Sequence, residues 1–398
     1  MSGVRFLLAS LILIGTVSPA QAQPKFVELV ADGKPYQGRV AARSDEKVWL
    51  FERDGRMQTL GVAGIQQFRK LSDSFTPLSA ADLRDQLRRE LAGGLEVVGT
   101  GHYLVAGPPQ LVREYAQVFE DQYRAVYSYF SVRGFDVQAP EFPLVAIVFP
   151  DQGRFAKYAL QDKVPAGPGL KGYYIQSSNR IALFHEAPPQ TSLLRQLGQP
   201  FELPGLSNRN AAAQFGRELA AAGSVRHVAW ANTEGDLQST MIHEATHQVA
   251  FNIGIHPRVG NVNPRWVVEG LATAFEAPGL RSTSLQRTPG AKLNGLRLTH
   301  FRDFVKNRRQ PKSLGQFVES DVVFAANVLD GYAQAWALTY FLIETRPREY
   351  SRLIKLIAAR PPGATYEEEQ RGADFKAAFG SDLVLLEAKF LRFIEDAK

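Results

Sequence analysis

The chain has 398 residues, of which 45% are hydrophobic and 22% charged; this composition is typical of globular proteins and excludes a fibrous or disordered chain. It contains no cysteine, which excludes disulfide bonds and lipid attachment at a cysteine. The formal net charge of +6 is modest for this length and gives only weak support to an anionic partner.

The first 22 residues have the pattern of a secretory signal peptide. Arg5 precedes an apolar run from Phe6 to Val17, and Ala20 and Ala22 supply the small residues of a cleavage site. The alternative is a membrane anchor, but the run is shorter than the roughly 20 residues that a bilayer span requires. We therefore predict export to the periplasm or the extracellular space, with cleavage near Ala22 and no membrane span in the mature chain.

Residues 23–74 predict a small β module. Asp32-Gly33 and Asp54-Gly55 are typical hairpin turns. The alternating stretches around them are Phe26–Val30, Gln37–Ala42, Val48–Glu52 and Met57–Val62. Such closely spaced hairpins indicate a small SH3-like β-barrel.

Residues 75–398 predict a second, larger unit that begins with an α/β part at 95–186. Its expected elements are a helix at Leu78–Leu91, a strand at Glu96–Val105, a helix at Pro108–Val132, a strand at Pro143–Phe149 and a strand or hairpin at Gly172–Phe184. We expect Gly172–Phe184 to be the sheet edge to which a peptide substrate adds. Residues 187–209 are rich in Pro, Gly, Gln and Asn, which favours a surface loop.

From residue 210 to residue 398 the apolar periodicity is mostly helical. The clearest helices are expected at Asn210–Ala222, Asp236–Ile253, Trp266–Ala277, Tyr332–Thr345 and Leu383–Ile394. The chain is therefore predicted to be an α+β protein with a small barrel, an α/β platform and a mainly helical remainder.

The segment from His243 to His247 has the His-Glu-x-x-His pattern. In a helix, residues four apart share one face, so both imidazoles can bind one metal ion while Glu244 lies beside the metal-bound water. Gly254 can end this helix. The alternative is a surface helix with two unrelated histidines.

A third ligand makes that alternative weaker. Glu269 lies 22 residues after His247, on the helix expected at Trp266–Ala277. His256-Pro257 and Asn263-Pro264 favour a turn between the two helices, which can bring the carboxylate to the same ion. Two imidazoles and one carboxylate, with one position open, are the donor set of a catalytic zinc site.

The stretch from His243 to Glu276 resembles the gluzincins, zinc peptidases with a glutamate ligand on the helix after the His-Glu-x-x-His helix. It is similar to their aminopeptidase N branch in Gln248, in the tryptophan before Glu269 and in the Gly-x-Ala after it. More broadly, the chain resembles exported bacterial proteins with a peptidase-MA-like domain of unknown function.

The resemblance implies a zincin-like domain in which His243, His247 and Glu269 bind Zn²⁺ and Glu244 is the catalytic base. Aminopeptidase N relatives also carry an oxyanion-stabilising tyrosine, and Tyr332 lies 63 residues after Glu269. The alternative for Tyr332 is core packing at the start of an apolar helix. The Gly-x-Met-x-Asn segment that binds a free amino terminus in those relatives is absent, which favours an endopeptidase.

Thr273 and Glu276 follow Glu269 by four and seven residues. Both share its helix face, so either could hold an imidazole N–H. The alternative is that both are surface positions.

Between Arg281 and Lys312 there are nine Lys or Arg residues and one acid, Asp303. This stretch is either a solvated basic face or a site that recognises an anionic substrate or an anionic envelope polymer. The expected partner is a peptide or protein substrate and not nucleic acid.

Two alternatives to the peptidase stay open. One is an envelope-binding or peptidoglycan-binding protein with a non-catalytic zinc site, and the other is a zinc amidase acting on peptidoglycan peptides. Glu244 argues against the first, because a structural zinc site needs no base.

Overall fold

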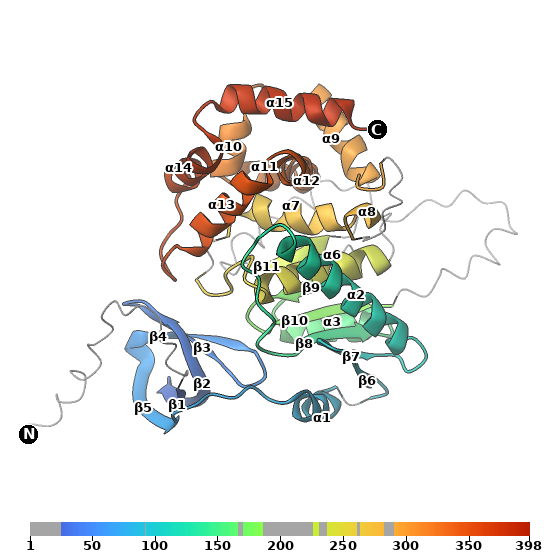
Figure 1. Cartoon of the computed structure of the whole chain (residues 1–398). Coiled ribbons are helices and arrows are strands. Elements are labelled where there is room, and N and C mark those ends of the chain that lie inside the picture. The colour runs from blue at the N-terminus through green and yellow to red at the C-terminus, as the bar shows by residue number, and fades with distance from the viewer. Residues whose placement is uncertain are drawn as a thin grey trace, which may run out of the picture.

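The computed structural model describes residues 25–91, 93–165, 170–185, 226–230, 237–260, 263–281 and 290–398. The expected signal peptide, the loop at 187–209 and the helix at Asn210–Ala222 lie outside these residues. The described chain consists of an N-terminal sheet, a central sheet and a helical C-terminal region (Figure 1). Within these residues, no helix has the length and apolar character needed to cross a membrane.

The N-terminal module is a five-stranded antiparallel sheet in the order β4-β3-β2-β1-β5. Its strands are β1 (Phe26–Ala31), β2 (Lys34–Arg43), β3 (Lys47–Phe51), β4 (Met57–Gly61) and β5 (Ile65–Ser72). Asp32 and Gly33 both have positive φ, which suits the tight turn expected between β1 and β2. No pairing joins β4 to β5 among the described residues, so the closed SH3-like barrel is not confirmed.

The central sheet has six strands in the order β11-β9-β10-β8-β7-β6. Its strands are β6 (Glu96–Gly99), β7 (Tyr103–Gly107), β8 (Leu144–Phe149), β9 (Leu170–Ile175), β10 (Arg180–Phe184) and β11 (Arg226–Trp230). The neighbours β7, β8 and β10 are parallel, and the outer strands pair antiparallel. Every residue of β8 is buried, as expected of a strand covered on both faces.

Helices cover both faces of this sheet. One face packs against α2 (Val112–Ser131) and α6 (Leu237–Asn252), and the other against α1 (Ala80–Glu90) and α3 (Gln152–Gln161). Successive residues of β8 enter opposite cores: Leu144 joins the core under α2 and α6, whereas Val145 joins the core under α1 and α3.

The edge of the sheet differs from the expectation. Gly172–Phe184 does form a hairpin, β9 and β10, but the prediction that it is the sheet edge is wrong. β11 pairs antiparallel with β9 and places Val228 opposite Tyr173. β11 is therefore the edge strand of the described sheet on the side next to β9.

The C-terminal region is a layered group of helices above α6 (Figure 1). They are α7 (Arg265–Phe275), α8 (Pro278–Arg281), α9 (Gly295–Asn307), α10 (Leu314–Glu319), α11 (Val322–Ala326), α12 (Val328–Thr345), α13 (Pro347–Ala358), α14 (Glu368–Phe379) and α15 (Leu383–Asp396). Fourteen consecutive residues of α12, Asp330 to Ile343, are buried. They share one hydrophobic core with α2 and α6, so platform and helices form one packed unit.

The N-terminal module contacts the turn between α6 and α7. Arg258 in this turn is buried, and its Nη2 donates to the carbonyl of Gly55 at 2.8 Å and to that of Gln176 at 3.0 Å. Its guanidinium also lies 4.7 Å from the centroid of the Phe51 ring. The module therefore packs against the segment that joins α6 and α7.

Candidate metal centre

Buried hydrogen bonds determine the rotation of α6 about its axis. Thr246 accepts a hydrogen bond from Nε2 of Gln122 on α2 at 2.7 Å. On the sheet side, Nε2 of Gln248 donates to the carbonyls of Val145 and Asn179 at 3.1 and 2.7 Å. Because these contacts anchor two faces of the helix, His243 and His247 are directed toward α7.

A glycine lets α7 approach α12 closely. A Cβ atom placed on Gly270 would lie 2.5 Å from the carbonyl oxygen of Ala335 and would also overlap the hydroxyl of Thr339. No real Cβ tolerates such contacts, so this position requires glycine. The close packing brings Glu269 of α7 and Tyr332 of α12 to the same side of α6.

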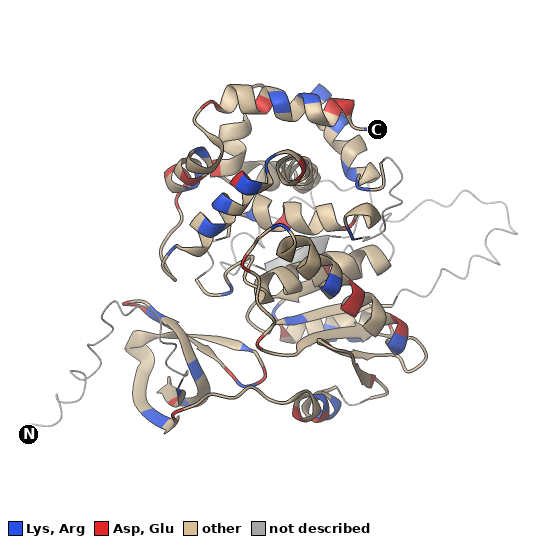
Figure 2. Ribbon diagram, in the orientation of Figure 1, with Lys and Arg blue, Asp and Glu red and all other residues tan. Residues whose placement is uncertain are grey.

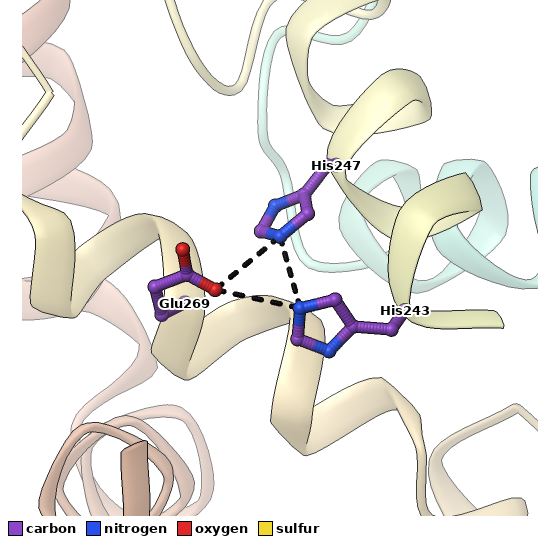
Figure 3. A group of neighbouring side chains, drawn as sticks. All are labelled: His243, His247 and Glu269. Carbon is purple, nitrogen blue, oxygen red and sulfur yellow. Dashed lines mark hydrogen bonds and ion pairs between the residues drawn. The ribbon is translucent and has the colours of Figure 1, made fainter. Parts of the chain in front are cut away.

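The three expected ligands converge (Figure 3). Nε2 of His243 and Nε2 of His247 lie 3.1 Å apart, and each lies 3.4 Å from Oε2 of Glu269. All three residues are buried. This group could therefore hold a metal ion.

A carboxylate holds the other side of the first imidazole. Nδ1 of His243 donates to Oε1 of Glu276 at 2.8 Å, and Nδ2 of Asn294 donates to Oε2 of the same carboxylate at 2.6 Å. Asn294 also caps α9, because its side chain accepts a hydrogen bond from the backbone N–H of Arg297. Glu276 thus directs Nε2 of His243 to the centre, the arrangement that metal-binding histidines require.

The carboxylates change the protonation of this group. Burial alone lowers the pKa of His243, but the hydrogen bonds to Glu269 and Glu276 outweigh it and raise the pKa from 6.5 to about 10. Burial alone raises the pKa of Glu276, but the hydrogen bond from His243 and the charge of Arg297 outweigh it and lower the pKa. In the metal-free protein, Glu269 and Glu276 therefore stabilise the protonated, positively charged form of the His243 imidazole.

Glu244 and Thr273 occupy different environments. Glu244 is fully buried on α6, next in sequence to His243. The hydroxyl of Thr273 donates to the backbone carbonyls of Glu269 at 2.6 Å and Gly270 at 3.1 Å. The Thr273 hydroxyl therefore donates its hydrogen bonds within α7, as threonine hydroxyls in helices often do. The imidazole of His243 is instead contacted by Glu276.

Tyr332 lies beside the cluster of His243, His247 and Glu269, which we call the metal group. Its ring centroid is 6.2 Å from that of His243, and the residue is buried. Burial raises the pKa of Tyr332 well above 10, and the negative charge of Glu269 raises it further. The hydroxyl therefore stays protonated at neutral pH and can donate a hydrogen bond.

Three basic residues in the described part of the stretch between Arg281 and Lys312 form ion pairs with acidic residues of the chain. Arg308 binds Asp330 and Asp303, Arg309 binds Glu387, and Lys292 binds Glu344. Basic and acidic residues also lie side by side on α1 and α15 (Figure 2). Sequence reasoning gave Arg297 a role only as one of the nine basic residues of this stretch and gave none to Asn294, for which the one local signal is that asparagine often caps a helix.

A family model described as a protein of unknown function (DUF1570) matches residues 237–364. The matched span runs from α6 through α13, so it includes His243, His247, Glu269, Glu276 and Tyr332. The description states no activity. No curated protein matches this sequence.

Proposed function

We propose that this chain is an exported zinc-dependent peptidase of the gluzincin type, acting as an endopeptidase. One observation carries the proposal: the side chains of His243, His247 and Glu269 converge, and Glu276 holds the imidazole of His243 from behind. A structural zinc site usually has four protein ligands, whereas three ligands leave a position open for a substrate or water.

The ligand spacing fits zinc. Zinc bonds to nitrogen and oxygen of about 2.0–2.1 Å in a tetrahedron imply about 3.3–3.4 Å between ligand atoms. The three separations here are 3.1, 3.4 and 3.4 Å. Two imidazoles and one carboxylate are also the donor set of catalytic zinc in known peptidases.

In this proposal the protein supplies a general base, Glu244, and a hydrogen-bond donor, Tyr332. Zinc, when bound, polarises a carbonyl and lowers the pKa of water. Glu244 accepts a proton from the attacking water and delivers it to the leaving amine. Tyr332 donates a hydrogen bond to the carbonyl oxygen as negative charge develops on it.

The position of β11 suits a peptide substrate. β11 is the edge strand of the described sheet and is followed in the chain by α6. An extended peptide can add to such an edge through backbone hydrogen bonds. The edge-strand role first expected of Gly172–Phe184 is thus reassigned to Arg226–Trp230.

The test is digestion of an unbiased peptide library by the zinc-loaded mature protein, with Glu244→Gln as the control. We expect cleavage within peptides by the wild type and none by the variant. Equal cleavage by both proteins would show a contaminating protease. No cleavage by a protein that binds zinc stoichiometrically would contradict the peptidase.

A further inference from the structure

Arg297 is a buried cation that has no counter-ion in direct contact. It lies in the first turn of α9 and is 7% exposed. Among the described residues its Nε has no hydrogen-bond partner, and its guanidinium takes part in no ion pair. A buried donor such as this Nε is costly, because it loses its hydrogen bonds to water and gains no hydrogen bond in the protein.

Two other arginines of α9 and its C-terminal end are different. On α9 itself, Arg302 donates to the backbone carbonyls of Ile394, Glu395 and Ala397. Arg308, at the end of the same helix, binds Asp330 through two nitrogens at 2.8 and 3.0 Å. The fold therefore satisfies these two cations, whereas the buried Nε of Arg297 has no hydrogen-bond partner among the described residues.

Two contacts place Arg297 beside the candidate site. Its Cζ lies 5.2 Å from the ring centroid of Tyr332, and that ring lies 6.2 Å from the ring of His243. Its backbone N–H binds Asn294, whose side chain holds Glu276. The planar guanidinium presents several donors in a fork that matches a carboxylate.

We propose that Arg297 binds a carboxylate of the substrate, so that the enzyme prefers peptides with a negative charge close to the scissile bond. This inference rests on the proposed function, because it gives the metal centre its substrate class. The charges of the site are compatible with an anionic substrate. A divalent metal ion and Arg297 together carry three positive charges, which equal the three negative charges of Glu244, Glu269 and Glu276. The centre then holds no surplus negative charge that would repel an anionic substrate.

The experiment measures binding and not activity. Zinc-loaded protein is titrated by calorimetry with the monohydroxamates of succinic, adipic and suberic acids and with their methyl esters. Acid and ester share the metal-binding hydroxamate and differ only in the charge at the far end. The variants are Arg297→Met and Arg297→Gln, with Arg302→Met as a matched control that removes a charge from the same helix.

We expect at least one acid to bind the wild type about tenfold or more tightly than its ester, since a hydrogen bond between a guanidinium and a carboxylate is about twice as strong as one between neutral groups. This preference should disappear in both Arg297 variants and persist in Arg302→Met, while ester affinity and zinc content stay unchanged. Two neutral replacements are used so that one misfolded variant does not decide the result.

The same acid-to-ester ratio in wild type and Arg297 variants, at every chain length, would show that Arg297 only balances charge and would overturn the proposal. Absence of binding by every ester would instead overturn the zinc centre, and this inference with it. Peptidyl hydroxamates then identify the source of the carboxylate. One peptidyl hydroxamate has a free C-terminal carboxylate, and the other has an amidated C-terminus and a glutamate side chain. The compound that binds Arg297→Met more weakly than it binds the wild type shows which carboxylate Arg297 recognises.

Discussion

Oε1 of Glu276 accepts a hydrogen bond from Nδ1 of His243 at 2.8 Å, and this contact determines which nitrogen of the imidazole faces the metal group. With one proton held on Nδ1, Nε2 faces His247 and Glu269, and its lone pair becomes available to a metal ion when Nε2 loses its own proton. The carboxylate lies one residue beyond the end of α7. The same short segment thus supplies both a ligand and the group that orients another ligand.

Replacement of Glu276 should weaken metal binding. We expect Glu276→Gln to lower zinc affinity by about 10–100-fold, because the amide cannot accept the imidazole proton as a carboxylate does. Competition with a chromophoric chelator measures this change. Glu368→Gln, at an exposed position of α14, serves as the control, and equal zinc affinity of the two variants would contradict the role of Glu276.

Metal binding should depend on pH. The pKa of His243 is raised in the folded, metal-free protein from 6.5 to about 10, so the metal must displace a proton. Zinc affinity should therefore rise by about tenfold per pH unit between these values. An affinity that is flat in this window would show that His243 is neutral before the metal binds.

The stability of the metal-free protein should change with pH in the opposite direction to the zinc affinity. A raised folded pKa contributes stability that is fully present below the unfolded pKa of 6.5 and is lost as pH rises to about 10. We therefore expect the denaturation midpoint of metal-free protein to fall over this range. Comparison with His243→Gln separates this effect from other titrations, because the variant should show a shallower decline.

Two residues of the site should separate metal binding from chemistry. Glu244→Gln should keep zinc and lose hydrolysis, because the amide cannot accept a proton. Tyr332→Phe should keep zinc and lose about a hundredfold or more in kcat with little change in KM, because its hydrogen bond forms as charge develops. Full activity of Tyr332→Phe would assign the tyrosine to core packing.

Gly270 should tolerate no side chain. Gly270→Ala places a methyl group against the carbonyl of Ala335, so we expect a loss of about 1–3 kcal/mol in the free energy of unfolding. The control is Gly315→Ala in α10, where the added Cβ meets only a Leu383 methyl at 3.6 Å. That change should be neutral or stabilising, because alanine favours helix more than glycine does. Equal stabilities for the two variants would contradict the close approach of α7 to α12.

Local spacing in the sequence was sufficient to predict the helices of the metal group and the three residues that converge there. His243 and His247 are four residues apart on one helix and Glu269 lies on the next helix, and helical periodicity is a property of neighbouring residues. The same is true of the hairpin turn at Asp32-Gly33, which the structure contains.

The tertiary structure alone decided which elements meet. Pairing of β11 with β9 moved the sheet edge away from Gly172–Phe184, and the absence of β4–β5 pairing leaves the N-terminal sheet open in the described chain. Arg297 meets Tyr332 because α9 packs against α12, and Asn294 meets Glu276 because the N-cap of α9 lies beside the C-terminal end of α7. Such contacts join residues far apart in the chain, so they depend on the packing of whole elements, which no local pattern encodes.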